Sequence, residues 1–324
     1  KTLSKVCEGK TPSEILNISV ADIACGSGIF LEEAFAYLQD YCVQWYISNG
    51  QTEHLIETGI DLYKLPLQEK KAILCSCIYG IDIDVHAVEV AKFSLLIKLI
   101  EDETAPSVAE VVPILPDLAD NIQFGNSLVS QAELNGISGA IHQMMEIAPF
   151  DWNTINNGRG FDVIIGNPPY VNTEGMHTLL PSAEVEVYKK KYKTSHKQFD
   201  KYFIFIEQAI NKINENGLVC YIVPNKFFKI GAGEKLRNLI AKERMLVSLD
   251  DFGDAQLFED KTIYSSIILL SKAKQTSFVY SSVDSANKLW AGEEVSSIER
   301  NSSVLNKLPW RLTTDFEFLT MLQR

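Results

Sequence analysis

The sequence predicts an α/β fold built on a doubly wound, mostly parallel sheet with helices on both faces. Two observations predict it. Short apolar runs alternate along the chain with segments whose apolar residues recur at helical spacing. Unusual polar motifs follow four of the predicted strands. Because ligands of such sheets bind beyond the carboxyl ends of the strands, these motifs indicate one shared binding edge.

The predicted elements alternate along the chain. Strands are expected where continuous apolar runs meet turn residues, at 19–24, 72–84, 121–128, 161–171, 217–228, 245–253 and 262–272. Helices are expected where the apolar spacing is helical, at 29–47, 86–100, 199–213 and 231–243. We predict one catalytic domain at 1–274 with a helical insertion at about 40–72. The pattern weakens after this, so 275–324 is predicted to begin a second domain.

Composition restricts the class of protein. With 324 residues, 46% hydrophobic and 22% charged, the chain suits one large α/β domain. Its net charge of −12 argues against a polyanionic partner unless a local basic surface or another domain makes that contact. Six scattered cysteines predict no zinc site and fit a reducing cytoplasm. We expect no membrane span and no signal peptide, and a first residue of Lys leads us to expect a fragment of a longer protein.

A glycine turn joins the first predicted strand to its helix. Gly26 and Gly28 remove side chains where the backbone must bend and approach a ligand. The motif is not GxGxxG, so the turn suits a cofactor without phosphates. Asp22 is then placed to hold a cationic amino group, directly or through water. A tight strand–helix turn with Ser27 as a cap is the alternative.

Acidic and amide residues follow the next two strands. Asp82 ends the second strand, where an acid accepts ribose hydroxyls in nucleoside-binding α/β folds. Ile83 is expected to pack on an adenine ring, and Asn126 to hydrogen-bond the adenine amino group. A cap for Asp82 and a surface turn for Asn126 are the structural alternatives. Asp84 is predicted to be the N-cap of the following helix.

The strongest local motif is Asn167-Pro168-Pro169-Tyr170, directly after an apolar strand. Consecutive prolines fix the backbone and leave the Pro168 carbonyl free to point into a pocket. That carbonyl and the Asn167 side-chain oxygen are two acceptors able to hold both hydrogens of an –NH2 group. The nitrogen lone pair is then directed at an electrophile, and Tyr170 offers a flat face for a base. A simple turn is the alternative.

Six segments of the chain resemble, in their order along the sequence, the motifs of adenine-N6 DNA methyltransferases of restriction–modification systems. Among these enzymes, the large methylase subunits and the fused enzymes look most similar to this chain. As in one arrangement of that family, the cofactor motif precedes the catalytic motif. The resemblance covers roughly residues 20–272 and is carried by 21–35, 79–95, 121–130, 161–171, 216–228 and 257–270.

The resemblance implies a Rossmann-like methyltransferase fold with a seven-stranded sheet and a reversed last hairpin. It implies S-adenosylmethionine as cofactor and a flipped adenine in double-stranded DNA as substrate. The residues expected to bind cofactor are Asp22, Ala24, Cys25, Gly26, Gly28, Asp82, Ile83, Asn126 and Asn167. Those expected to act on the target base are Asn167, Pro168, Pro169 and Tyr170. Phe258 matches the aromatic that stacks on the extruded base, with an ordinary core residue as the alternative.

The resemblance also has consequences outside the centre. It implies a cytoplasmic protein of a bacterium or archaeon, with a separate or fused nuclease and recognition subunit. Residues 275–324 would begin a truncated target-recognition domain, and the segment that usually closes over the cofactor is mostly missing. The family usually has Pro where Ile23 stands and often Asp where Asn126 stands, which leaves the adenine contact of Asn126 in doubt.

A basic and aromatic stretch, 188–202, follows the NPPY motif. We predict that it is a mobile loop that contacts DNA phosphates, whereas a solvated lysine-rich helix is the alternative. The residues concerned are Lys189, Lys190, Lys191, Lys193 and Lys197.

Two rival functions remain open from the sequence. The same fold and motif serve enzymes that methylate ribosomal RNA adenine or a release-factor glutamine, although the insertion and long tail fit the DNA enzymes better. A catalytically inactive DNA-binding scaffold is the second rival, against which the intact Asn167 and Tyr170 argue. A C5-cytosine enzyme is disfavoured because no Pro-Cys pair supplies its nucleophile.

Overall fold

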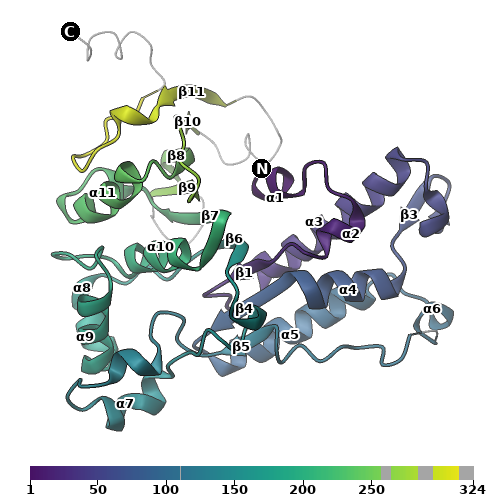
Figure 1. Cartoon of the computed structure of the whole chain (residues 1–324), viewed down its shortest axis with the longest axis horizontal. Coiled ribbons are helices and arrows are strands. Elements are labelled where there is room, and N and C mark those ends of the chain that lie inside the picture. Colours follow the sequence, from purple (N-terminus) through teal and green to yellow (C-terminus); the bar gives the residue numbers. More distant parts are fainter. Residues whose placement is uncertain (110, 257–263, 284–294, 314–324) are drawn as a thin grey trace. The chain divides into compact units, whose positions relative to one another are not determined.

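The computed structural model describes residues 1–109, 111–256, 264–283 and 295–313 (Figure 1). The chain divides into two compact units. Unit 1 comprises Lys1–Gln131 and Ala148–Gly166, and unit 2 comprises Ala132–Ile147 and Asn167–Arg324. Within the described residues, no helix is both long and apolar enough to cross a membrane.

The four central strands of unit 1 are parallel. They lie in the order β6-β1-β4-β5, and each neighbouring pair is parallel. Their bounds are β1 (Val20–Asp22), β4 (Ile78–Asp82), β5 (Ile122–Phe124) and β6 (Phe161–Gly166). Each of the four polar motifs therefore follows the carboxyl end of a parallel strand, as the sequence predicts.

Helices cover the unit 1 sheet and supply most of its core. Apolar residues of the three long helices pack with strand residues such as Val20 and Ile78, all fully buried. The helices are α1 (Thr2–Cys7), α2 (Pro12–Ile15), α3 (Ile29–Ser48), α4 (Leu67–Cys77), α5 (Val85–Ile100) and α6 (Ala105–Ala109), with short 3-10 turns η1 (Thr52–His54), η2 (Gln131–Leu134, which runs into unit 2) and η3 (Asn156–Gly158).

Two local predictions in unit 1 were wrong. Residues 72–77 belong to α4 rather than to a strand, because Lys70, Ile73, Leu74 and Cys77 bury one helical face. The insertion is not wholly helical, since it contains the antiparallel hairpin β2 (Ile56–Gly59) and β3 (Leu62–Lys64).

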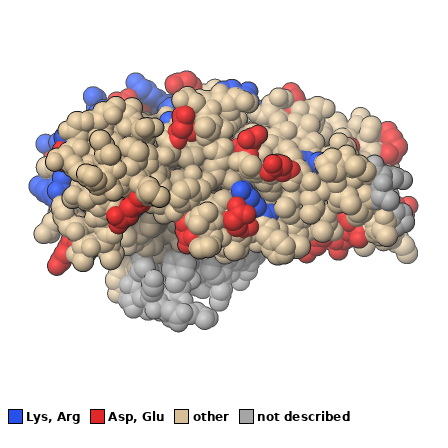
Figure 2. Space-filling view, turned by 90° about the horizontal axis from the view of Figure 1, so that it is seen from below, with Lys and Arg blue, Asp and Glu red and all other residues tan. Residues whose placement is uncertain are grey.

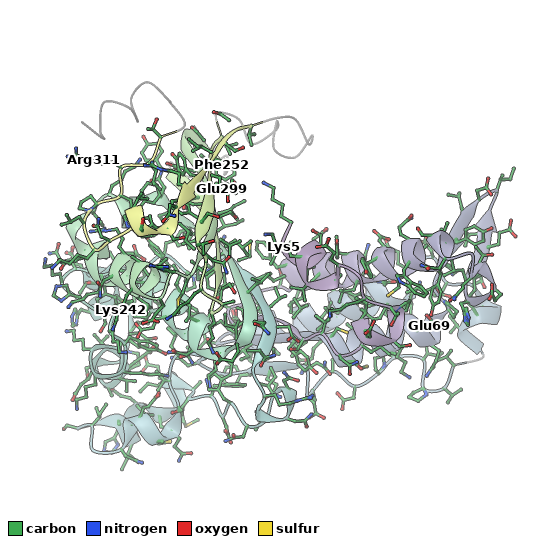
Figure 3. All side chains as sticks on the ribbon, turned by 45° about the horizontal axis from the view of Figure 1, so that its top comes forward. Lys5, Glu69, Lys242, Phe252, Glu299 and Arg311 are labelled. Atoms are coloured by element: carbon green, nitrogen blue, oxygen red, sulfur yellow. The ribbon has the colours of Figure 1, made fainter. Side chains whose placement is uncertain are left out.

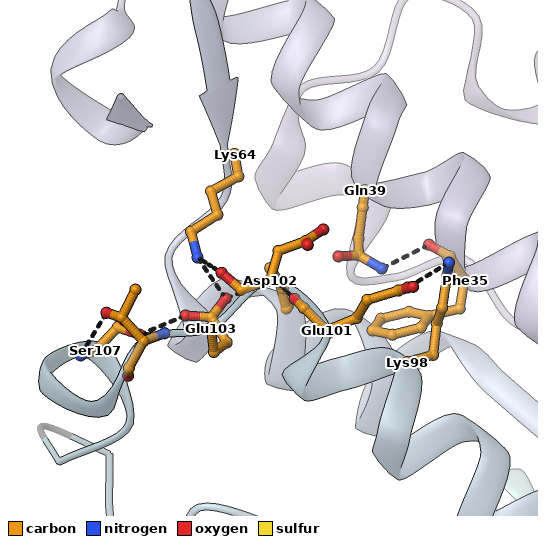
Figure 4. Close-up of polar contacts among 10 residues, drawn as sticks. Phe35, Gln39, Lys64, Lys98, Glu101, Asp102, Glu103 and Ser107 are labelled. Carbon is orange, nitrogen blue, oxygen red and sulfur yellow. Dashed lines mark hydrogen bonds and ion pairs between the residues drawn. The ribbon is translucent and has the colours of Figure 1, made fainter. Parts of the chain in front are cut away.

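A buried ion cluster ties this hairpin to the helices (Figure 4). The Glu103 carboxylate, 1% exposed, lies 2.6 Å from the Lys70 Nζ and 3.1 Å from the Lys64 Nζ. Burial alone would raise the pKa of Glu103, but hydrogen bonds from Lys70, Ser107 and Lys64 outweigh it and hold that pKa below its usual range. The cluster therefore joins the inserted hairpin, α4 and the segment after α5 through one ionised side chain.

The sheet of unit 2 is mixed. Its order is β11-β10-β8-β9-β7; β8 and β10 are parallel, and the other three neighbouring pairs of this order are antiparallel in the part of the chain that the structure describes. The strands are β7 (Ile213–Pro224), β8 (Leu246–Gln256), β9 (Tyr264–Ser271), β10 (Ser277–Ser282) and β11 (Ser296–Asn301). Phe252 of β8, labelled in Figure 3, packs with Val283 and Ile267.

The strand count of the two units compares directly with the prediction. The four parallel strands of unit 1 (β1, β4, β5 and β6) together with β7, β8 and β9 match the seven predicted strands, and β9 is antiparallel to both β7 and β8. The strands β10 and β11 lie in the segment predicted to begin a second domain, yet β10 hydrogen-bonds to β8 over four residues. The division at residue 274 stays a prediction.

The helices of unit 2 include the amphipathic α10, whose residues Tyr202–Ile206 are all buried. The helices are α7 (Ala140–Ile147), α8 (Thr173–Leu179), α9 (Ser182–Lys191), α10 (Lys201–Lys212) and α11 (Glu234–Lys242), with 3-10 turns η4 (Asn225–Phe228), η5 (Gly231–Gly233) and η6 (Ser302–Val304). Arg237 of α11 is also buried, because its guanidinium donates to the carbonyls of Phe227, Ile230 and Lys307.

Candidate active site

The turn after β1 depends on its glycines. Gly26 and Gly28 have φ values of +52° and +91°, which disfavour any other residue. A Cβ on Gly28 would lie 3.0 Å from the Cβ of Ala91, so the helices α3 and α5 also need a glycine there. A Cβ on Gly26 would meet nothing within 4 Å, which leaves open space beside the turn. Gly28, not Ser27, is the N-cap of α3, and no side chain caps that helix.

Asp82 holds this turn in place. Its Oδ2 accepts the Gly26 N–H at 2.7 Å, and its Oδ1 accepts the Asp84 N–H at 2.9 Å. Asp84 is the N-cap of α5, because its Oδ1 accepts the N–H groups of His86 and Ala87, so that prediction is confirmed. Asp82 is therefore not the helix cap, and each of its carboxylate oxygens keeps a lone pair for a ligand.

Asp22 is a buried acid at the end of β1. Its side chain is 2% exposed, and its Oδ1 accepts the Ala24 N–H at 3.0 Å. Burial raises the pKa of Asp22 to about 7, and the negative charge of Asp82 adds to that rise while the Ala24 hydrogen bond opposes it. The groups that shift this pKa include no cation, so the carboxyl is poised to gain from a cationic ligand.

Gly166, the last residue of β6, lies against Asp22. Its φ is +150°, and a Cβ built on it would lie 2.6 Å from the Asp22 Oδ1. Only glycine fits there without a shift of either the β6 end or the Asp22 side chain. Since Asn167 is bonded to Gly166, the predicted catalytic motif starts one residue after a backbone that touches the predicted cofactor carboxylate. Sequence reasoning missed this residue, although a glycine between an apolar strand and the NPP triplet was the available signal.

The remaining cofactor-site predictions of unit 1 fall around the same strand ends. Ile83 is 44% exposed, whereas Cys25 is 6% and Asn126 4% exposed. The Asn126 Oδ1 accepts the Leu128 N–H at 3.1 Å, so this residue lies in a buried turn rather than a surface one. The Ser127 hydroxyl donates to the Ile23 carbonyl at 2.6 Å and ties this turn to the glycine turn.

The NPPY motif opens unit 2. Asn167 and Tyr170 are half-buried, Pro168 is buried and Pro169 is exposed. The Tyr170 hydroxyl lies within hydrogen-bond distance of the Asn167 Oδ1 and of the Ile222 carbonyl, 2.9 Å away. Within the described part of the chain, no donor is bonded to the Pro168 carbonyl. This carbonyl is therefore open to a ligand, and the Asn167 oxygen keeps a second lone pair beside its contact with the Tyr170 hydroxyl, so both can serve as the predicted acceptors.

The ring of Tyr202 packs against the ring of Tyr170. The rings of Tyr170 and Tyr202 meet edge to face, with centroids 5.8 Å apart and planes at 82°. The Tyr202 hydroxyl donates to the Pro224 carbonyl at 3.2 Å, two residues after the Ile222 carbonyl used by Tyr170. The end of β7 thus fixes both tyrosines, and sequence reasoning did not single out Tyr202 for this role.

The basic stretch begins as the end of a helix and continues as turns and bends between α9 and α10, so the expectation of a loop was wrong for its first part. Lys189, Lys190 and Lys191 form the last turn of α9, because Tyr188 anchors that helix in the interior. Two of the five lysines pair with nearby acids at less than 3 Å, Lys190 with Glu186 and Lys191 with Glu133. Lys193 follows the helix, and Lys197 lies 3.7 Å from Glu234. The role of these lysines in binding DNA stays a prediction, and Phe258 lies outside the described residues.

Comparison with known proteins identifies relatives by sequence. A family model described as "Eco57I restriction-modification methylase" matches residues 76–258. The Type II restriction enzyme and methyltransferase RM.Eco57I of Escherichia coli is 41% identical over 315 residues, which cover 94% of this chain and 31% of that protein. The Type II methyltransferase M.PaeR7I of Pseudomonas aeruginosa is 31% identical over 113 residues, covering 35% of this chain and 19% of the relative. The chain spans less than a third of the length of either relative.

Solved structures share the fold at low identity. The chain matches a nuclease-deletion mutant of the Type ISP restriction-modification enzyme LlaGI in complex with a DNA substrate mimic, with a TM-score of 0.59 and 14% identity, over 98% of this chain and 26% of that one. It matches the Type IIL restriction-modification enzyme MmeI in complex with DNA with a TM-score of 0.58 and 15% identity, over 90% and 35%. These matches show a shared fold, and together with the sequence relatives they confirm the predicted fold class, a Rossmann-like methyltransferase fold.

Proposed function

Because the chain belongs to the Eco57I restriction-modification methylase family, we propose that it carries the methyltransferase centre of a restriction–modification enzyme. The proposed reaction transfers a methyl group from S-adenosylmethionine to N6 of an adenine extruded from double-stranded DNA. The observation that carries this proposal is the continuity at Gly166: its backbone lies against the buried Asp22 carboxylate, and the NPPY motif follows at once.

The residues of unit 1 fit this cofactor. Asp22 is a buried carboxylate with a raised pKa and no cation among the groups that shift it, which suits the amino group of a methionine moiety. The open space beside Gly26 suits close approach of a ligand without phosphates. Asp82 retains acceptor capacity for ribose hydroxyls, and the exposed Ile83 offers an apolar face to an adenine ring. When bound, the cofactor supplies an electrophilic methyl group.

The residues of unit 2 would prepare the acceptor. The Asn167 Oδ1 and the Pro168 carbonyl accept the two hydrogens of the target amino group, which draws its lone pair out of conjugation with the ring. The Tyr170 hydroxyl fixes the Asn167 amide by hydrogen bonding, and its ring offers a stacking face. The N6–methyl bond forms as the sulfur–methyl bond breaks, the neutral thioether leaves, and the methylated amino group then loses its extra proton. Positioning supplies the rate, because attack on a sulfonium methyl needs no general base.

The acidic composition is compatible with DNA as partner. Figure 2 shows Lys and Arg side chains gathered at the left of the view, where Figure 1 draws the helices α7 to α9 and α11 of unit 2. Such a local basic surface suffices for phosphate contacts on a protein of net charge −12. We propose that a nuclease and a recognition module, fused or separate, complete the enzyme.

The test is radiolabelled methyl transfer by the full-length protein to unmethylated DNA, ribosomal RNA and a release factor. Digestion of the product to nucleosides then identifies the modified base. The proposal expects label in DNA, recovered as N6-methyladenine. Label in ribosomal RNA or in glutamine would establish a rival acceptor, and a folded protein that binds cofactor but labels nothing would establish the inactive scaffold.

A further inference from the structure

Asp200, an acid that follows the NPPY motif in the sequence, is buried, and helix capping does not explain the free-energy cost of burying its carboxylate. Asp200 precedes α10 at the N-cap position, where an Asp side chain normally accepts a helix N–H, yet it makes no such bond. It is 5% exposed, and its Oδ1 is buried with no hydrogen-bond partner among the residues that the structure describes. An unsatisfied buried carboxylate oxygen is destabilising, so a role other than capping is indicated.

The other carboxylate oxygen of Asp200 holds a cation. Its Oδ2 lies 3.2 Å from the Nζ of Lys226, the second residue of η4. The two partners differ sharply in environment, because the Lys226 side chain is 49% exposed and the Asp200 side chain 6%. A buried anion thus fixes the direction of a lysine whose ammonium still faces solvent with two further donors.

Both residues are built onto the elements that hold the predicted target-base residues. Asp200 forms an antiparallel bridge with Asn172, and the Lys201 N–H donates to the Val171 carbonyl at 2.8 Å. Lys226 follows the end of β7, whose Ile222 carbonyl lies 2.9 Å from the Tyr170 hydroxyl. Burial first, and the negative charge of Asp200 second, raise the pKa of Tyr170.

We infer that Lys226 binds a DNA backbone phosphate next to the extruded nucleotide, and that Asp200 is the positioning residue that aims its ammonium there. This inference rests on the proposed function for its choice of DNA as ligand. A lysine held by a buried acid contacts a phosphate with less loss of side-chain freedom than an unrestrained surface lysine. It would anchor the strand on the side of the centre formed by β7 and the segment after Tyr170.

The test measures DNA binding and methyl transfer separately in the full-length protein, using unmethylated genomic DNA as the probe. Lys226→Gln should weaken binding and lower the slope of log affinity against log salt by about one, while leaving cofactor affinity unchanged. Lys226→Arg should restore the slope. Lys229→Gln is the matched control, since Lys229 is an exposed lysine three residues away whose Nζ lies over the Phe228 ring; its slope should stay that of the wild type.

Asp200→Asn distinguishes positioning from structural support. It should raise KM for DNA and leave the salt slope near that of the wild type, because the lysine remains but is no longer aimed. Added to Lys226→Gln it should have no further effect on KM. A wild-type slope in Lys226→Gln, an equal loss in Lys229→Gln, or additive effects of the two changes would overturn the inference. If the wild type bound DNA but transferred no methyl group, the proposed function would be refuted. The slope of log affinity against log salt in Lys226→Gln would then still test whether Lys226 binds a phosphate.

Discussion

Replacing Asp22 by Asn should make the cofactor-free protein more stable at neutral pH while impairing cofactor binding. The Asp22 carboxyl is 2% exposed and faces the negative Asp82, so folding disfavours its ionised form. An asparagine has nearly the same shape and still accepts the Ala24 N–H through its amide oxygen. It removes the charge that folding has to bury, and with it the attraction for a cationic ligand.

The magnitude follows from the pKa, which rises from 3.8 to about 7 on folding. A rise of about three units corresponds to about 4 kcal/mol at ~1.4 kcal/mol per unit. An acid whose pKa is raised in the fold binds its proton longer in the folded state than in the unfolded one. The contribution of Asp22 to the free energy of unfolding is therefore greatest below pH 3.8, and it falls as the pH rises toward about 7. About 3 kcal/mol of that loss falls between about pH 5 and 8.

Urea unfolding of both proteins at about pH 5 and 8, without cofactor, measures this effect. The free energy of unfolding of Asp22→Asn relative to the wild type should increase by about 3 kcal/mol from the lower to the higher pH. Calorimetry should show the wild type releasing protons when it binds S-adenosylmethionine below pH 7, and Asp22→Asn releasing none from this site. A stability difference between the two proteins that is the same at both pH values would refute the reasoning about Asp22.

Three other substitutions test the structure more locally. Gly166→Ala places a Cβ 2.6 Å from the Asp22 Oδ1 at a φ of +150°, so unfolding should become easier by about 3 kcal/mol; an unchanged urea midpoint would contradict this contact. Glu103→Gln leaves Lys70, 6% exposed, without its anion, and thermal melts should show a loss of about 3 kcal/mol. Arg237→Met leaves three backbone carbonyls without the guanidinium that now donates to them. The free energy of unfolding in urea should therefore fall by at least about 2 kcal/mol. The same substitution at an exposed lysine of this helix should change it little.

The sheet and its motifs could be predicted because they depend on local patterns. Short apolar runs fix the strands, and residues such as Gly28 and Asp84 occupy turns whose backbone geometry restricts the side chain. The failures have a physical cause as well. An apolar run such as 72–77 is compatible with a buried strand or a buried helix, and only the spacing back to Leu67 decides for the helix. The hairpin in the insertion depends on a distant partner, since Lys64 is anchored by Glu103.

The candidate site could be predicted by residue type but not by contact. The sequence identified Asp22 and Asn167 individually, yet no local pattern shows that Gly166 lies against Asp22, because that contact joins residues 144 positions apart. Asp200 and Lys226 escaped for the same reason. Although both lie in segments that the sequence singles out, 188–202 and 216–228, no local pattern pairs them, because their pairing depends on α10 meeting the end of β7. Contacts between distant segments need the folded structure.

The most direct measurement of the central claim is methyl transfer by Asn167→Ala in the full-length protein, with the dissociation constant of S-adenosylmethionine measured on the same sample. Loss of one of two acceptors for the amino group should lower transfer by at least about a hundredfold and leave cofactor affinity within about threefold of the wild type. Asn135→Ala, at an exposed asparagine of unit 2, should leave both values unchanged. Transfer at the wild-type rate by Asn167→Ala would contradict the account.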